Sequence, residues 1–166
     1  MPTEPWQRGS AYVNGVRLHY VTRGAGKLLV LLHGFPEFWY SWRHQIPPLA
    51  EHFRIVAPDM RGYNESDKPA GVASYRLDLL TADVMGLIRA FGEDKAIVVG
   101  HDWGGGVAWT FAADFPQATE RLIVLNCPHP GAFQQQIRSN FRQLRRSWPS
   151  TPASTEAMKF KRRTGL

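Results

Sequence analysis

Four short apolar runs recur along the chain, and stretches with helical periodicity separate the later ones. The runs occupy residues 28–32, 54–57, 96–99 and 122–125. A continuous apolar run of this length is typical of a strand that is covered on both faces. Apolar residues recur at three- and four-residue spacing from Leu77 to Phe91, and Trp103–Ala113 is a second helical candidate. Strands that alternate with helices predict an α/β fold with a mostly parallel sheet and helices on both faces.

An antiparallel hairpin is predicted ahead of this α/β pattern. Asn14-Gly15 separates Tyr12-Val13 from residues 16–22, in which apolar side chains alternate with polar ones. Asn-Gly is typical of a two-residue hairpin turn, because both positions of that turn require positive φ. The chain has 166 residues, a length that favours one domain and excludes an eight-stranded βα barrel of about 250 residues.

The charge of the chain is unevenly distributed. The formal net charge is +6, but eight of the 20 basic residues and one of the 14 acidic residues lie from Arg138 onward. Residues 1–137 therefore carry twelve basic and thirteen acidic groups, which favours a small-molecule protein without a specific nucleic-acid partner. No apolar run reaches the roughly 18 residues of a membrane span, and Cys127 has no second cysteine to pair with. We expect a cytoplasmic protein without a membrane partner, a metal site or a disulfide.

A glycine-flanked aspartate lies between the third apolar run and the second helical candidate. The segment reads Gly100-His101-Asp102-Trp103-Gly104. This is the arrangement of a nucleophile elbow, in which small residues flank a sharp strand-to-helix turn and the central side chain is exposed. Asp102 is therefore the predicted nucleophile. Two alternatives remain: Asp102 as a helix N-cap, and phosphate binding by the turn, although neither GxGxxG nor GxxxxGK occurs.

A second candidate loop, residues 33–37 (His-Gly-Phe-Pro-Glu), directly follows the first apolar run. Beside a nucleophile elbow, such a loop supplies one backbone N–H of an oxyanion hole, and the residue after the nucleophile supplies the other. We assign these two donors to Phe35 and Trp103. We interpret His33 as a residue that holds the loop by hydrogen bonding, in preference to a catalytic histidine. An aromatic helix is predicted over Phe38–Trp42.

A third loop, residues 57–69, follows the second apolar run and contains Asp59 and Arg61. These side chains are oppositely charged and two residues apart, so an ion pair across the turn is one interpretation. The other is ordinary turn chemistry in a segment rich in proline, glycine and asparagine.

Four segments together resemble the α/β-hydrolase superfamily, and specifically its soluble epoxide hydrolases. They are HGFPE (33–37), DMRGYNES (59–66), GHDWGG (100–105) and NCPHP (126–130). The resemblance extends from about Tyr12 to about Trp148 and implies an α/β-hydrolase core with Asp102 as nucleophile. It also implies that six residues position the loops: His33, Gly34, Pro36, Asp59, Arg61 and His101. Asn64 occupies a position where the family usually has glycine, and asparagine tolerates positive φ.

The resemblance implies a two-step hydrolysis through an ester of Asp102. Its carboxylate attacks an epoxide carbon to form an alkyl ester, and water then attacks the carboxyl carbon to release a vicinal diol. The implied partners are a small apolar epoxide and water, without a cofactor. Haloalkane or haloacid dehalogenases of the same superfamily are the alternative. They are less similar, because haloalkane dehalogenases typically have Asn in place of Phe35, and fluoroacetate dehalogenases usually have Arg in place of Trp103.

Several groups that the family uses are absent from this sequence. The family takes a general base from a histidine after its last strand, an orienting acid from a late loop and proton donors from cap tyrosines. The chain has none at such positions, and Asn126 fills the place of the acid in some dehalogenases. We therefore expect an N-terminal fragment with the core over 1–131, the start of a cap helix over 132–148 and a disordered basic tail over 149–166.

Such a fragment lacks the last strands of the core and most of the cap. We expect it to be inactive in turnover and to leave one sheet edge and apolar surface uncovered. A non-catalytic binding remnant that uses this edge is therefore a further alternative.

Overall fold

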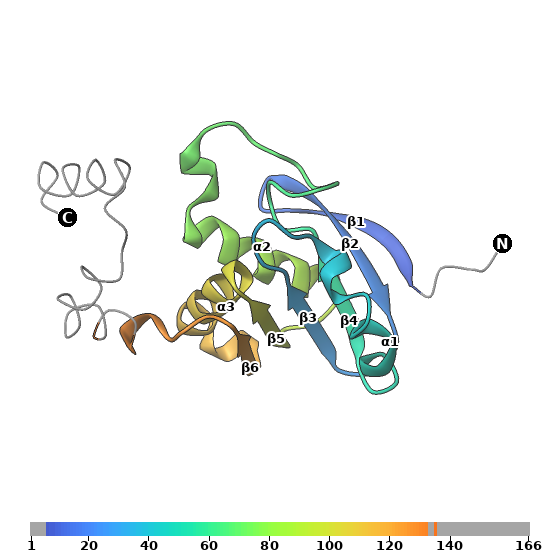
Figure 1. Ribbon diagram of the computed structural model, residues 1–166. Helices are drawn as coiled ribbons and strands as arrows, with labels where there is room; N and C mark the ends of the chain where they lie inside the picture. Colours follow the sequence, from blue (N-terminus) through green and yellow to red (C-terminus); the bar gives the residue numbers. More distant parts are fainter. Residues whose placement is uncertain (1–5, 133–134, 136–166) are drawn as a thin grey trace, which may run out of the picture. The chain divides into compact units, whose positions relative to one another are not determined.

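The computed structural model describes residues 6–132 and residue 135 (Figure 1). Residues up to Cys127 form one compact unit. The predicted cap helix over 132–148 lies outside the described residues except at positions 132 and 135, and the predicted tail over 149–166 lies entirely outside them. Within the described part, no helix combines the length and the apolar character that crossing a membrane requires.

Six strands form one sheet in the order β1-β2-β4-β3-β5-β6. The strands are β1 (Gln7–Val13), β2 (Val16–Arg23), β3 (Leu28–Leu32), β4 (Arg54–Pro58), β5 (Ala96–His101) and β6 (Thr119–Leu125). β2 pairs antiparallel with β1 and with β4, whereas the pairs β4–β3, β3–β5 and β5–β6 are parallel. The predicted α/β class, with a mostly parallel sheet and an N-terminal hairpin, is confirmed.

The hairpin turn has the geometry that its sequence predicts. Asn14 and Gly15 have φ angles of 47° and 76°, and Val13 pairs with Val16 across them. Two consecutive positive φ angles match the twist of the flanking strands, which is why Asn-Gly is favoured there.

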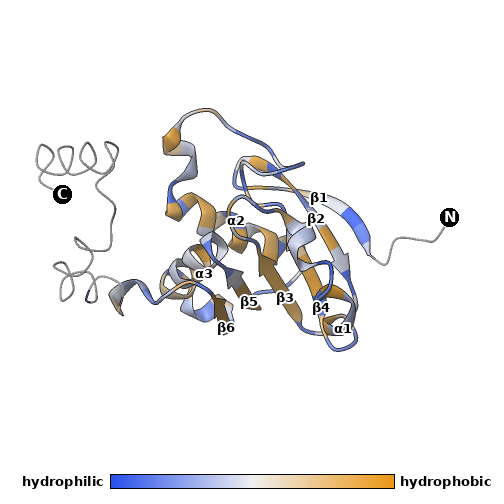
Figure 2. Cartoon of the chain, viewed as in Figure 1, coloured by the Kyte–Doolittle hydropathy of each residue, from blue (hydrophilic) through white to orange (hydrophobic). Residues whose placement is uncertain are grey.

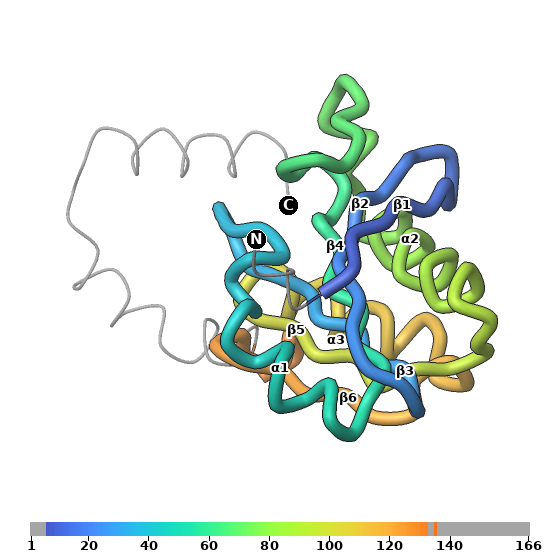
Figure 3. The backbone as a smooth tube through the Cα atoms, turned by 90° about the vertical axis from the view of Figure 1, so that its right-hand side faces the viewer, coloured from blue at the N-terminus to red at the C-terminus, as the bar shows by residue number. Residues whose placement is uncertain are grey.

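Helical segments cover both faces of the sheet (Figures 1 and 3). α2 (Leu77–Ala90) and α3 (Trp103–Asp114) pack on one face, and η1 (Trp39–Trp42) and α1 (Ile46–Leu49) pack on the other. Two further short 3-10 helices are η2 (Val72–Tyr75) and η3 (Pro116–Ala118). Both long helices were predicted, and Gly92, with φ of 77°, follows the end of α2.

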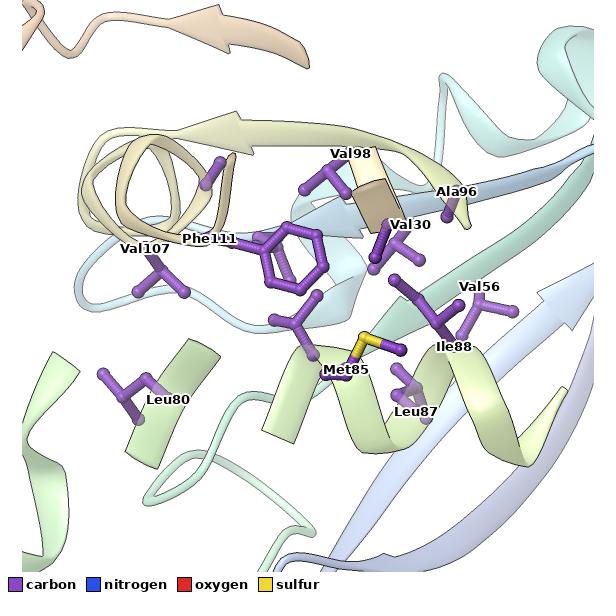
Figure 4. Packing of buried hydrophobic residues seen from close by; sticks show 14 of the residues in the cluster. Val30, Val56, Leu80, Met85, Leu87, Ile88, Ala96, Val98, Val107 and Phe111 are labelled. Atoms are coloured by element: carbon purple, nitrogen blue, oxygen red, sulfur yellow. The ribbon is translucent and has the colours of Figure 1, made fainter. Parts of the chain in front are cut away.

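The central strands are buried on both faces, which explains their continuous apolar sequences. In β3, Val30 and Leu32 join the cluster under α2 and α3, whereas Leu29 and Leu31 join the cluster under η1 and α1. Figure 4 shows the first cluster, in which the Phe111 ring lies between the strands and α2. The apolar colouring of these strands is visible in Figure 2.

Two predicted elements differ from the observed ones. The aromatic helix predicted over Phe38–Trp42 is a four-residue 3-10 helix, because Phe38 has extended backbone angles (φ −154°, ψ −178°) and the chain tightens only after it. β6 begins at Thr119, three residues before the predicted apolar run. Its first three residues, Thr119, Glu120 and Arg121, are all polar, so a search for continuous apolar runs does not find them.

β6 lies at one edge of the sheet. Among the described residues it pairs only with β5, and Ile123 and Leu125 are 46% and 43% exposed. The described part of the chain therefore exposes a sheet edge and apolar side chains at this strand.

The strand order creates a topological switch point between β3 and β5. The chain leaves β3 for β4 on one side, and it leaves β5 for β6 on the other side. In open α/β sheets, the two loops diverge at such a point and leave a crevice at the carboxyl ends of the strands. Here those ends are Leu32 and His101, so both predicted site loops begin at this crevice.

Candidate active site

Asp102 occupies a sharp turn between β5 and α3. Its φ of 49° and ψ of −116° lie in a region that L-residues rarely adopt. The turn depends on two glycines: a Cβ on Gly100 would lie 2.3 Å from the carbonyl oxygen of Gly104, and one on Gly104 would lie 2.5 Å from that of His33. Asp102 occupies the N-cap position of α3, as one interpretation of the sequence has it, but its side chain does not make the hydrogen bond of a capping residue.

The Asp102 carboxylate accepts hydrogen bonds from two backbone N–H groups. The N–H of Phe35 donates to Oδ1 at 3.0 Å, and the N–H of Trp103 also donates to the carboxylate. These two bonds hold the pKa of Asp102 below its usual 3.8. The carboxylate is therefore ionised at neutral pH, and the N–H groups of the two residues predicted as oxyanion-hole donors lie beside it.

His33 joins the first loop to the loop after β4. It is completely buried; its Nδ1 lies 2.9 Å from the carbonyl oxygen of Gly34, and its Nε2 accepts the N–H of Met60 at 3.0 Å. Because Nε2 accepts, the proton is on Nδ1, which donates to Gly34. Burial lowers the pKa of His33, and the Tyr63 ring packs edge-on against it, 4.8 Å away. His33 thus holds two loops together, and the turn continues through a cis bond before Pro36.

A second set of polar contacts surrounds Gly34. Its N–H donates to Glu37 Oε2 at 3.2 Å, and the same oxygen lies 3.3 Å from His101 Nδ1. His101 Nε2 lies 3.2 Å from the amide nitrogen of Asn126, the residue after β6. Sequence reasoning assigned no function to Glu37, and Asn126 was noted only for its position. The signal for Glu37 was its place in the segment 33–37.

A cleft of about 360 Å³ lies beside the Phe35 and Trp103 backbone. Apolar and aromatic side chains form most of its wall, together with one buried arginine: Phe35, Met60, Arg61, Gly62, Tyr63, Tyr75, Leu80 and Trp103. A pocket of this size and composition suits a small apolar ligand. Within the described residues, no three His, Cys, Asp or Glu side chains come together to form a metal site.

Comparison with known proteins identifies the family of this chain. The alpha/beta hydrolase fold family matches residues 27–157, which include β3 to β6 and every loop of the candidate site. The chain belongs to the alpha/beta hydrolase fold family.

Relatives of this α/β-hydrolase include several epoxide hydrolases. It is 48% identical over 147 residues to epoxide hydrolase 1 of Caenorhabditis elegans, covering 87% of this chain and 36% of that protein. It is 57% identical over 120 residues to an AB hydrolase superfamily protein of Bacillus subtilis, covering 70% and 42%. An epoxide hydrolase structure from Bacillus megaterium in complex with an inhibitor matches with a TM-score of 0.79 and 41% identity, covering 95% and 57%. The chain thus spans less than half the length of these two curated relatives.

The interpretation of Asp59 and Arg61 as an ion pair is wrong for this α/β-hydrolase. The buried Asp59 carboxylate lies 2.8 Å from His19 Nδ1 and accepts the N–H of Trp39 at 3.1 Å and the amide of Asn64 at 2.9 Å. β4 ends at Pro58 and the chain turns immediately, so residues two apart no longer point to the same side. Asn64 has φ of 38°, the positive value expected where the family usually has glycine.

Arg61 instead makes a buried two-pronged ion pair with Asp83 of α2. Its Nε and Nη2 donate to the two carboxylate oxygens at 2.8 and 2.6 Å, and both side chains are only 6% exposed. Asn14 in the hairpin turn donates to the same carboxylate at 2.8 Å. The hydrogen bonds from Arg61 to Asp83 raise the pKa of Arg61. Asp83 was missed from the sequence because it lies in the middle of an amphipathic helix, where a polar residue ordinarily faces solvent.

Proposed function

We propose that this α/β-hydrolase is an epoxide hydrolase that opens an epoxide to a vicinal diol through an ester of Asp102. One observation carries the proposal: an ionised carboxylate is exposed on a strand-to-helix turn, with the N–H groups of Phe35 and Trp103 donating to it. The names of the relatives support an epoxide as substrate. The largely apolar and aromatic cleft that Phe35 and Trp103 line supports a small apolar molecule as substrate.

In the first step, the Asp102 carboxylate attacks an epoxide carbon. A lone pair of its free oxygen forms the new C–O bond, the epoxide C–O bond breaks, and the alkoxide takes a proton from water or from a nearby hydroxyl. The hydrogen bond from Phe35 holds Oδ1, so we assign the attack to the other oxygen. The low pKa of Asp102 keeps the nucleophile ionised at neutral pH.

In the second step, water attacks the carboxyl carbon of Asp102, and the negative charge that develops lies on the carbonyl oxygen of the ester. The N–H groups of Phe35 and Trp103 already point at the carboxylate, so no rearrangement is needed for them to stabilise this charge. The ester C–O bond to the carboxyl carbon then breaks, the leaving alkoxide takes a proton from the attacking water, the diol leaves, and the oxygen of that water remains in the carboxylate.

The 166-residue chain should perform the second step slowly. His101 is the histidine adjacent to Asp102, and both of its ring nitrogens are engaged, one by Glu37 and one by Asn126. His33 is buried and holds the loops. Neither of these two histidines near Asp102 is available as a general base, and without that contribution hydrolysis of the ester loses a factor of about 10² to 10⁴, so we propose that the ester accumulates.

The test is the covalent adduct. The 166-residue chain is incubated with a reactive aryl epoxide and analysed by intact mass and by peptide mapping, with Asp102→Asn as the control. We expect an adduct of the epoxide mass on Asp102 and no adduct in the control. After slow hydrolysis in heavy-oxygen water, the label should be in Asp102 and absent from the first diol.

Three results would contradict this proposal. They are label entering the first diol directly, adduct formation that persists in Asp102→Asn, and no adduct in a chain that melts cooperatively. Faster release of bromide from a bromoalkane than loss of the epoxide would instead assign the site to a dehalogenase, which uses the same first step.

A further inference from the structure

A network of polar side chains links the three loops that meet beside Asp102. Asn126 follows β6, His101 precedes the proposed nucleophile, and Glu37 closes the loop after β3. The contacts measure 3.2 Å from Asn126 Nδ2 to His101 Nε2 and 3.3 Å from His101 Nδ1 to Glu37 Oε2. Glu37 Oε2 also accepts the N–H of Gly34 at 3.2 Å. This network therefore connects the edge strand β6 to the loop that carries the Phe35 N–H donor.

The donors and acceptors in this network assign one tautomer to His101. The amide nitrogen of Asn126 only donates, so His101 Nε2 must accept with its lone pair. In a neutral imidazole the proton is then on Nδ1, where the Glu37 carboxylate can accept it. This arrangement satisfies both contacts of His101. The reverse tautomer would place N–H against N–H at Asn126 and lone pair against lone pair at Glu37.

The packing at Gly34 couples this network to the candidate site. A Cβ on Gly34 would lie 3.0 Å from His101 Nδ1, 3.0 Å from Asp102 Cβ and 3.2 Å from Glu37 Oε2. The imidazole and the carboxylate thus lie directly against the backbone of Gly34, and the next N–H in the chain, that of Phe35, donates to Asp102. A displacement of His101 or Glu37 therefore displaces this donor.

The end of β6 is itself fixed relative to the turn at Asp102. The N–H of Asp102 donates to the carbonyl oxygen of Leu125 at 3.0 Å, and the next residue, Asn126, has φ of 53°. This left-handed conformation is one that asparagine tolerates better than most residues, and the Asn126 amide contacts His101 from it.

We infer that Asn126 is a positioning residue, which acts through His101 and Glu37 to hold the Phe35 N–H on the carboxylate of Asp102. The inference deepens the function proposed above and rests on it for the consequence in catalysis. It adds the end of β6 to a site otherwise formed by the loops after β3 and β5.

The experiment uses the 166-residue chain and three variants. Asn126→Ala removes the donor, Asn126→Asp replaces it with an acceptor, and Gln117→Ala is the matched control, since Gln117 is an exposed amide on η3. Nitrogen NMR of the imidazole rings reports which nitrogen of His101 carries the proton. Hydrogen exchange of the Phe35 amide and the rate of Asp102 alkylation by the aryl epoxide report the position of the donor.

We expect the wild type to carry the His101 proton on Nδ1, and Asn126→Asp to place a proton on Nε2, a change that a purely structural contact would not produce. Asn126→Ala should accelerate exchange of the Phe35 amide and slow alkylation of Asp102 by about two- to tenfold, the effect of one lost hydrogen bond. Gln117→Ala should change neither quantity.

Two results would overturn the inference: a wild-type His101 protonated on Nε2 alone, or an Asn126→Ala variant with unchanged Phe35 exchange. Failure of the wild type to react with the epoxide, together with the expected NMR and exchange results, would refute the proposed function and leave the positioning of the Phe35 amide by Asn126 supported.

Discussion

Replacement of Asp83 by alanine should destabilise the fold more than any ordinary surface substitution. The variant removes both carboxylate oxygens that bind Arg61, at 2.8 and 2.6 Å, and the acceptor of the Asn14 amide. The guanidinium is 6% exposed, so water does not readily replace these partners. Its remaining acceptors are the carbonyl oxygens of Asn14 and Ser74, at 3.2 and 3.4 Å.

The magnitude follows from the cost of leaving a buried charge without its partner. Breaking one side of a buried ion pair typically costs about 3–5 kcal/mol, which is a large fraction of the roughly 5–15 kcal/mol that stabilises a natural domain. Asp83→Asn should cost less, because the amide retains one acceptor oxygen and the shape of the side chain. The double variant Arg61→Met/Asp83→Leu removes the charge as well as its partner, so it should lie within about 2 kcal/mol of the wild type.

Urea unfolding followed by tryptophan fluorescence measures these free energies. With a slope of about 2 kcal/mol per molar urea, a loss of 4 kcal/mol lowers the midpoint by about 2 M. An Asp83→Ala variant that loses less than about 1 kcal/mol would refute the assignment of a buried charge to Arg61. A double variant that loses as much as Asp83→Ala would show that packing, and not the unpaired charge, produces the effect.

Two further predictions concern pH. Two backbone N–H groups hold the pKa of Asp102 below 3.8; the rate of its alkylation should therefore stay constant from about pH 7 to pH 5 and halve only below pH 3.8, and a midpoint above 3.8 in a pH–rate profile of the folded chain would contradict the hydrogen bonding. Burial lowers the pKa of His33 from 6.5. Below pH 6.5 the unfolded chain therefore binds a proton at this histidine that the folded chain does not bind. The free energy of unfolding should fall as the pH drops below 6.5, by at most about 1.4 kcal/mol per pH unit from this group. Urea midpoints at about pH 7.5 and pH 5.5 should differ less in His33→Asn than in the wild type, and an equal difference would show that other groups produce the dependence.

The elements of the sheet could be predicted because their sequence signals are local. β3 and β5 are buried on both faces, and burial of that kind requires a continuous apolar run that is visible without any knowledge of neighbours. The turn at Asp102 is local in the same sense, since Gly100 and Gly104 are required by contacts within and directly beneath the turn. Where the local pattern is weaker, as in the first half of β6, the strand begins earlier in the structure than the sequence predicts.

The polar partners could not be predicted because they join distant segments. Arg61 has an opposite charge two residues away in Asp59, yet its partner is Asp83 on α2, and Asp59 binds His19 on β2. The choice depends on which element packs against each side of the loop, and that is a property of the assembled sheet and helices. The same holds for the contact of Asn126 with His101 across two parallel strands.

The strain at Asp102 connects the fold to the proposed chemistry. A non-glycine residue with φ of 49° and ψ of −116° costs of order 1–3 kcal/mol, so the surrounding structure must hold it. Two backbone hydrogen bonds do so, from Asp102 to Leu125 at 3.0 Å and from Gly104 to His33 at 3.1 Å, and both acceptors lie at the ends of neighbouring parallel strands. The same strand ends place Phe35 and Asn126 around the carboxylate. The order β3-β5-β6 therefore stabilises the turn and assembles the groups around Asp102 through one set of contacts, and a substitution that loosens the turn should also misplace its hydrogen-bond donors.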